Sequence, residues 1–159
     1  MNSNNKQPVI IGVDGGGTKV TAGIIEKHQD IFCLNKSSSN LYYLENPDFD
    51  IGFSPVNMRN QFRELQANEI KPTSAEIAQG KSIINSFRDV ILDLNINSPV
   101  LIGIGMVGLK TSDNRGIGAM ANGPRMPKFC AHLEQLLQDE NIGLKYPIRQ
   151  LGSDADYCG

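Results

Sequence analysis

Three consecutive glycines mark a place where the backbone of this chain could bind an anion. They belong to a six-residue segment: Asp14, Gly15, Gly16, Gly17, Thr18 and Lys19. Glycine adopts positive φ angles without steric cost, so the segment predicts a tight turn whose N–H groups can surround phosphate oxygens. Thr18 adds a hydroxyl group, and the Asp14 carboxylate suits a hydrated Mg²⁺ that bridges phosphates. The pattern therefore predicts a phosphate-binding turn, with a plain glycine-rich hairpin as the alternative.

Two other glycine patterns look like phosphate-binding motifs but stand in the wrong context. Gly12 and Gly17 have the spacing of P-loop glycines, but a threonine separates the second glycine from Lys19 and a strand-like segment follows. Residues 103–108 match the dinucleotide fingerprint G-x-G-x-x-G, which should open a helix. Residues 109–118 are polar and loop-like instead. We therefore expect neither a P-loop nor a Rossmann glycine loop.

The composition of the 159-residue chain excludes several classes of protein. The net charge is −2 and basic residues form no run, so we expect neither nucleic acid nor an anionic membrane as a partner. There is no apolar stretch of about 18 residues, and the first residues lack the pattern of a signal peptide. Cys33, Cys130 and Cys158 are odd in number and far apart, which argues against disulfides and zinc. We expect a cytoplasmic protein, and homodimer formation stays open.

The hydrophobic pattern predicts strands and helices in a definite order. Strand-like runs occupy residues 9–14, 20–26, 30–34, 100–107 and 146–151. Helices are predicted at 58–66, 74–94 and 127–138. Polar loops are predicted at 37–40 and 109–118, and an irregular excursion at 42–72 encloses the first helix. In the longest helix, Thr73 or Ser74 is the expected N-cap, Glu76 the acid of the first turn, and Ile77 the start of the apolar stripe.

This order of elements predicts an α/β fold with a mixed five-stranded sheet and helices on both faces. The first three strands would form an antiparallel meander, and the later strands would alternate with helices. A length near 150 residues predicts one domain, at 9–159, after a disordered polar lead-in at 1–8.

Several of these motifs together resemble a known group of kinases. The DGGGTK segment between two strands is similar to the first phosphate motif of the superfamily of sugar kinases, Hsp70 and actin. The segments IGIGMVG, ANGP and SDAD, with an amphipathic helix before the last, resemble bacterial glucokinases and the ROK sugar kinases. The resemblance covers about 9–35 and 73–159, and it implies an RNase H-like lobe of the actin-like ATPase type. The excursion at 42–72 has no counterpart in it.

The resemblance implies an ATP-dependent sugar kinase that phosphorylates a hydroxyl group, the 6-hydroxyl of glucose or of a related hexose. Asp14 and the glycine segment would bind the ATP phosphates and Mg²⁺. Asn122, with Gly123 beside it, would bind sugar hydroxyls, and Asp154 would contact the sugar and act as general base. These kinases have a second lobe, so the chain is expected to be a truncated N-terminal lobe, inactive by itself.

Other functions stay open because the sequence departs from the glucokinase pattern. Ser153 stands where the family has Asn before the base, and the Gly-Pro pair after the fourth strand is missing. The triple glycine and Asn40 are also similar to N-acetylglucosamine kinases of the BadF/BadG type, in which Asn40 would bind the sugar. In that branch the base would follow the fourth strand, where Lys110 stands at the expected position and Asp113 is the nearby acid. A non-catalytic ATP- and sugar-binding regulator is a third alternative.

Overall fold

The first three strands pair in sequence order, and the later strands join the opposite side of the first. The computed structural model describes residues 7–153. Its main sheet consists of β1 (Val9–Gly15), β2 (Lys19–His28), β3 (Ile31–Tyr42), β4 (Val100–Met106) and β7 (Leu151–Gly152). The strand order is β3-β2-β1-β4-β7. β1, β2 and β3 are antiparallel neighbours, whereas β4 is parallel to β1 and β7 is parallel to β4. The predicted mixed five-stranded sheet is therefore confirmed.

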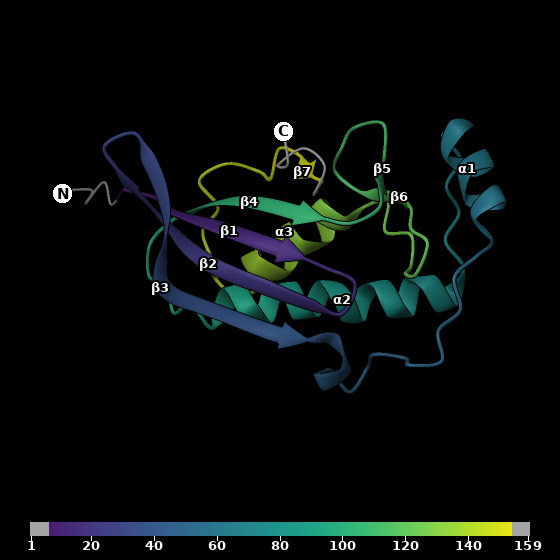
Figure 1. Ribbon diagram of the computed structural model, residues 1–159, viewed down its shortest axis with the longest axis horizontal. Coiled ribbons are helices and arrows are strands. Elements are labelled where there is room, and N and C mark those ends of the chain that lie inside the picture. Colours follow the sequence, from purple (N-terminus) through teal and green to yellow (C-terminus); the bar gives the residue numbers. More distant parts are fainter. Residues whose placement is uncertain (1–6, 154–159) are drawn as a thin grey trace.

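The helices and a small second sheet lie between and beyond these strands. They are the 3-10 turn η1 (Tyr43–Glu45), α1 (Met58–Gln66), α2 (Ser74–Leu92), α3 (Phe129–Asp139), and the paired strands β5 (Leu109–Lys110) and β6 (Ile117–Ala119). Figure 1 shows α2 and α3 running along the main sheet, while α1, β5 and β6 lie past the ends of β1 and β4. The helix predicted at 58–66 is confirmed with those bounds.

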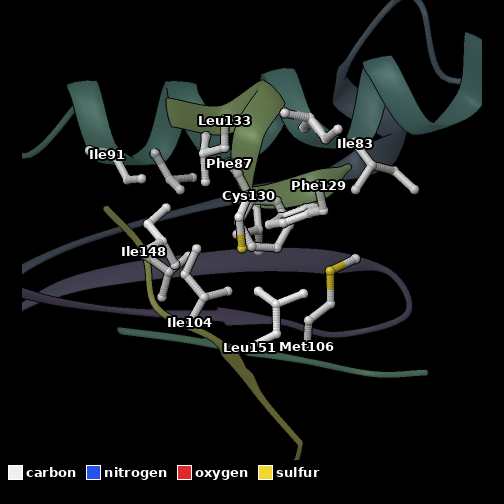
Figure 2. Close-up of a cluster of buried hydrophobic side chains, with 14 of the residues drawn as sticks. Ile83, Phe87, Ile91, Ile104, Met106, Phe129, Cys130, Leu133, Ile148 and Leu151 are labelled. Carbon is white, nitrogen blue, oxygen red and sulfur yellow. The ribbon is translucent and has the colours of Figure 1, made fainter. Parts of the chain in front are cut away.

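Within the described residues, α2 and α3 cover the same face of the sheet, so the expectation of helices on both faces is not met there. The two helices contact each other, and the rings of Phe87 and Phe129 meet edge to face with centroids 5.0 Å apart. Alternate residues of β1, such as Ile11 and Val13, are buried beneath them. Figure 2 shows this core, in which Phe87, Cys130 and Leu133 of the helices point toward residues of the strands.

The opposite face offers little apolar surface for a helix near the carboxyl end of the sheet. The residues of β1 that alternate with the buried ones include Gly12, which is half-buried, and Asp14, which is exposed. In β4, Gly103 is exposed and presents no side chain. Because a helix packs by burying an apolar stripe against apolar neighbours, this composition explains why both long helices lie on the other face.

The start of α2 follows its sequence signals closely. The Thr73 hydroxyl accepts a hydrogen bond from the Glu76 N–H at 3.2 Å, and the Glu76 carboxylate accepts one from the Thr73 N–H at 2.8 Å. This capping box satisfies two N–H groups that the first helical turn leaves unpaired. Ile77 differs from its prediction as a core residue, because its side chain is 61% exposed.

Three segments outside the helices differ from their predictions. Residues 37–40 are part of β3 rather than a loop, because an edge strand next to solvent can carry polar side chains while its backbone pairs with β2. The predicted loop 109–118 contains β5 and the first two residues of β6. In place of the strand predicted at 146–151, the structure has β7, which shares only Leu151 with that range, because the Ile148 N–H donates to the Glu134 side chain instead of to a neighbouring strand.

Among residues 7–153, no helix combines the length and the apolar character needed to cross a bilayer.

Candidate functional site

The candidate phosphate turn lies at the edge of the sheet where parallel strands end together. Asp14 is paired with Gly105 of β4, and Gly105 is paired in turn with Gly152 of β7. On the other side, Asp14 is paired with Thr21, which is paired with Asn40 of β3. Ligands of open α/β sheets bind beyond the carboxyl ends of parallel strands, so this edge is the expected place for a ligand.

One row of residues therefore crosses all five strands at this edge. Directly paired residues share a face of a sheet, and neighbouring strands lie about 4.8 Å apart, so Asp14 and Asn40 are separated by roughly 10 Å. The row consists of Gly152, Gly105, Asp14, Thr21 and Asn40. Its polar members are partly or fully exposed. Sequence reasoning missed Thr21, because only the strand register aligns it with Asp14.

The glycine segment forms a tight turn, but not for the predicted reason. The Gly16 N–H donates to the Lys19 carbonyl at 3.0 Å, which leaves Gly17 and Thr18 exposed at the tip. Within residues 7–153, Gly108 is the glycine with a positive φ, at 100°. The prediction that the three glycines adopt positive φ is therefore wrong. The Gly16 N–H is already bonded within the turn, so an anion would meet the exposed tip instead.

The surroundings of the turn require a glycine at position 15 but not at position 17. A Cβ atom on Gly15 would lie 2.2 Å from the Cζ of Phe87, a separation that atoms cannot adopt. A Cβ atom on Gly17 would meet nothing within 4 Å. Gly15 therefore lets the turn pack directly on α2, whereas Gly17 faces open space that a phosphate group can enter.

Replacing Gly15 by Ala is expected to destabilise the protein by about 1–3 kcal/mol, because Phe87 is fully buried against Phe129 and has no room to move. Gly17→Ala is the matched control and should stay within about 0.5 kcal/mol of wild type. Urea unfolding of both variants measures the difference. Equal stability of the two would contradict the packing role of Gly15.

Tyr43 anchors the turn from the buried side, and sequence reasoning did not identify it. Its hydroxyl donates to the Gly16 carbonyl at 3.3 Å, and its backbone N–H donates to the Thr18 carbonyl at 3.0 Å. Burial, and then the negative charge of Asp14, raise the pKa of the Tyr43 phenol, which therefore remains a donor at neutral pH. The sequence signal that could have identified Tyr43 is an aromatic residue within a polar segment.

Lys19 is exposed, and its side chain lies near Tyr42 of β3. Its ammonium group lies 6.0 Å from the centroid of the Tyr42 ring, at the outer limit of a cation–π contact. Asp14, Gly17, Thr18 and Lys19 are the exposed residues of the candidate phosphate turn, whereas Gly15 is buried and Gly16 is half-buried.

Asp14 is the carboxylate that the described residues place beside the candidate phosphate turn. No group of three or more His, Cys, Asp or Glu side chains suited to a metal occurs in the described part of the chain. Mg²⁺ commonly keeps several waters and binds one or two carboxylates together with substrate phosphates. Asp14 is exposed beside the open tip of the turn and fits this mode of Mg²⁺ binding, in which the protein does not enclose the ion.

The candidate sugar loop lies between β6 and α3. Paired backbone hydrogen bonds of 2.9 Å join Ile117 and Met126 at its base. Asn122 is exposed. Gly123 is buried, and a Cβ atom there would lie 2.6 Å from the Met120 Sδ. Figure 1 shows the segment that follows β6 extending beyond the carboxyl ends of β1 and β4. The segment that follows β6 and the glycine turn thus lie toward the same end of the sheet.

The two candidate bases differ in what the structure says of them. Asp154 lies outside the described residues, one position after Ser153. Asp113 accepts a hydrogen bond from the Thr111 hydroxyl at 2.6 Å and one from the Arg115 N–H at 2.9 Å. The Thr111 hydrogen bond, followed by the Arg115 N–H, lowers the pKa of Asp113. Its carboxylate therefore closes the turn at 111–116, and its lowered basicity suits proton abstraction poorly.

A buried ion-pair network beside the sugar loop was not foreseen from the sequence. The Arg125 guanidinium donates 2.7 Å hydrogen bonds to both carboxylate oxygens of Glu76, and 1% of each side chain is exposed. A third donor of Arg125 meets Glu64 at 2.5 Å. Burial opposes ionisation of Glu76, but hydrogen bonds from Arg125 and Thr73 outweigh it and lower the pKa of that carboxyl. The network ties α1, α2 and the loop together.

The solved structures to which this chain is similar include three sugar kinases. An inorganic polyphosphate/ATP-glucomannokinase from Arthrobacter sp. strain KM matches with a TM-score of 0.54 and 16% identity, over 94% of this chain and 46% of that one. A ROK family glucokinase from Streptomyces griseus, in complex with glucose and AMPPNP, matches with a TM-score of 0.48 and 14% identity, over 89% of this chain and 33% of that one. A ROK hexokinase from Thermus thermophilus matches with a TM-score of 0.47 and 17% identity, over 92% of this chain and 35% of that one. No protein-family model and no curated protein matches the chain.

At such low identity the likeness to the glucomannokinase concerns the fold alone. The chain spans less than half of the length of that kinase. The strand order, the parallel placement of β4 and β7 and the turn at the end of β1 agree with the fold that the motifs imply. The chain therefore shares its α/β fold with part of this glucomannokinase.

Proposed function

We propose that the protein is an ATP-dependent sugar kinase that transfers the γ-phosphoryl group of ATP to a hydroxyl of a hexose, the 6-hydroxyl of glucose or of a related sugar. The observation that carries the proposal is the position of Asp14 and the open glycine turn at the carboxyl edge of the sheet. The fold shared with the glucomannokinase supports it. The chain covers part of that kinase, so the activity is proposed for the complete protein.

Phosphoryl transfer requires alignment of the reactants, neutralisation of charge and a base, rather than covalent chemistry by the protein. ATP supplies the phosphoryl group, and Mg²⁺ reduces the repulsion between its oxygens. In the proposed site, the tip of the turn at Gly17 and Thr18 would bind phosphate oxygens, and the Asp14 carboxylate would hold Mg²⁺. Asn122 hydrogen-bonds sugar hydroxyls. Asp154 accepts the proton of the attacking hydroxyl.

A coupled assay of ADP release on the complete protein tests the proposal. Glucose, N-acetylglucosamine, N-acetylmannosamine and fructose are compared at equal concentrations with ATP and Mg²⁺. Turnover with a hexose is the expected result. Sugar binding without ADP release from any sugar would contradict the kinase function and favour the regulator instead.

The position of Asn40 keeps N-acetylglucosamine kinase as a second candidate function. The strand register aligns Asn40 with Thr21 and Asp14 on one face of the sheet, so a sugar there would lie near the phosphate turn. The hydrogen bonds of Asp113 count against it as the base in this branch. The preferred sugar in the assay separates the two kinases.

Replacing Asp113 by Asn is expected to leave kcat within about twofold of wild type, because the amide oxygen can still accept from Thr111 and Arg115. The same assay with the preferred sugar measures it. A loss of about a hundredfold or more would instead identify Asp113 as the base and support the N-acetylglucosamine kinase branch.

A further inference from the structure

Helix α1, in the excursion that the family resemblance does not cover, reaches the candidate sugar loop through one buried side chain. Gln61 is fully buried. Its Oε1 accepts a hydrogen bond from the Met120 N–H at 2.8 Å, and its Nε2 donates to the Met120 carbonyl at 3.2 Å and to the Val56 carbonyl at 2.6 Å. Both backbone polar groups of Met120 are therefore bonded to one amide, which fixes the position and the orientation of that residue.

The same helix also contacts the other end of the loop. Glu64, one turn after Gln61, accepts a hydrogen bond from Arg125 at 2.5 Å and one from the Lys71 N–H at 3.1 Å. Glu76 of α2 accepts from the same guanidinium on its other side. Charge-assisted hydrogen bonds of this kind are shorter and stronger than neutral ones, so Arg125 is a firmly held point.

Asn122 lies between these two held residues. Ala121 and Asn122 are exposed, whereas Gly123 and the proline after it are buried. The approach of α1 depends on Gly118 of β6, because a Cβ atom there would lie 2.4 Å from a methyl carbon of Leu65. The arrangement thus leaves a short exposed apex that carries the candidate sugar ligand, with both of its ends fixed by α1.

We infer that α1 is a positioning element for sugar binding, in which Gln61 and Glu64 hold Met120 and Arg125 so that Asn122 is preorganised toward the sugar. This inference rests on the proposed function. Preorganisation strengthens binding because the loop no longer has to be ordered when the ligand arrives. Gln61 and Glu64 do not touch the substrate in this proposal, so they are positioning residues rather than catalytic ones.

The first arm of the test is hydrogen exchange in the complete protein without ligand. Gln61→Met removes every hydrogen bond of the amide while keeping a similar side-chain length. We expect the Met120 N–H to exchange at least about tenfold faster in this variant, since its acceptor is lost. Gln66→Met, on the exposed side of the same helix, is the matched control and should leave that exchange unchanged.

The second arm is steady-state kinetics with the preferred sugar. In Gln61→Met the sugar KM should rise about tenfold, while kcat stays within about twofold and the KM for ATP is unchanged. A general loss of folded protein would lower the apparent kcat instead. If Gln61→Met fails to fold, Glu64→Gln serves in its place, because Glu64 is partly exposed and its amide can still accept from Arg125. A smaller rise in the sugar KM is expected there.

Different measurements distinguish a failure of the proposed function from a failure of the positioning role. A wild-type protein that phosphorylates no sugar contradicts the proposed function and, with it, this inference. A wild-type kinase whose Gln61→Met and Glu64→Gln variants keep the wild-type sugar KM contradicts the positioning role alone. Unchanged exchange at Met120 in Gln61→Met contradicts the role of Gln61 in holding the loop.

Discussion

Replacing Asp154 by Asn is expected to lower kcat by about 10²–10⁴-fold while sugar binding largely survives. The amide has the shape of the carboxylate and can still accept a hydrogen bond from the sugar hydroxyl, but it cannot take up the proton. The effect should appear in kcat, with the sugar dissociation constant changed by less than about threefold. The coupled assay and calorimetric sugar titration of the complete protein measure the two quantities.

Asp156→Asn is the matched control for this experiment, since it makes the same substitution two residues later. It should retain kcat within about threefold of wild type, because a single base suffices for the proton transfer. A kcat near wild type in Asp154→Asn would refute its assignment as the base. Parallel loss of sugar binding and kcat in that variant would instead assign Asp154 to substrate binding.

Replacing Arg125 by Met is expected to destabilise the protein by about 3–5 kcal/mol. The substitution leaves the Glu76 carboxylate buried with 1% exposure and without its bidentate partner. Removing one partner of a buried pair costs more than the pair itself contributes, because the remaining charge keeps its desolvation penalty. Urea unfolding at pH 7 measures the change.

The pH dependence of this variant should have the opposite sign to that of wild type. In wild type the pKa of Glu76 is lowered, so the stability it contributes is present above the unfolded pKa and is lost as the pH falls through the folded one. Without Arg125, burial raises the pKa of Glu76. Between the unfolded and the raised folded pKa the native state then binds more protons, so its stability rises as the pH falls.

Arg88→Met is the control for the network, because Arg88 forms a more exposed ion pair with Asp89 at 2.7 Å. Pairs of that kind contribute up to about 1 kcal/mol, and the variant should keep the wild-type pH dependence. If Arg125→Met loses no more stability than Arg88→Met, the buried network does not hold the loop in place. In that case the role of Glu64 as a positioning residue also loses its support.

Local signals in the sequence predicted most of the elements of the fold. The capping pair Thr73 and Glu76 marked the start of α2, and α1 at 58–66 has the predicted bounds. These predictions succeed because capping and periodicity depend on residues within one or two turns. The order of strands likewise predicted the mixed sheet and its carboxyl edge, where the turn after Asp14 lies.

The predictions that were wrong concern what a residue meets across the chain. The glycines of the phosphate turn were expected to need positive φ, but Gly15 is required by Phe87, which comes from α2. Asn40 was expected in a loop, but β2 supplies pairing partners that make it part of a strand. Ile77 has the spacing of a core residue, yet its side chain is largely exposed among the described residues.

The sequence by itself determined the α/β class, the starts of α1 and α2 and the tight turn after Asp14, because each depends on residues close together along the chain. The tertiary structure decided which groups surround the candidate sugar loop. Glu76 illustrates both: its capping bond to Thr73 is local, whereas its ion pair with Arg125 joins residues far apart in sequence. Sequence spacing carries no information on such pairs, since burial and register bring them together only when the chain is folded.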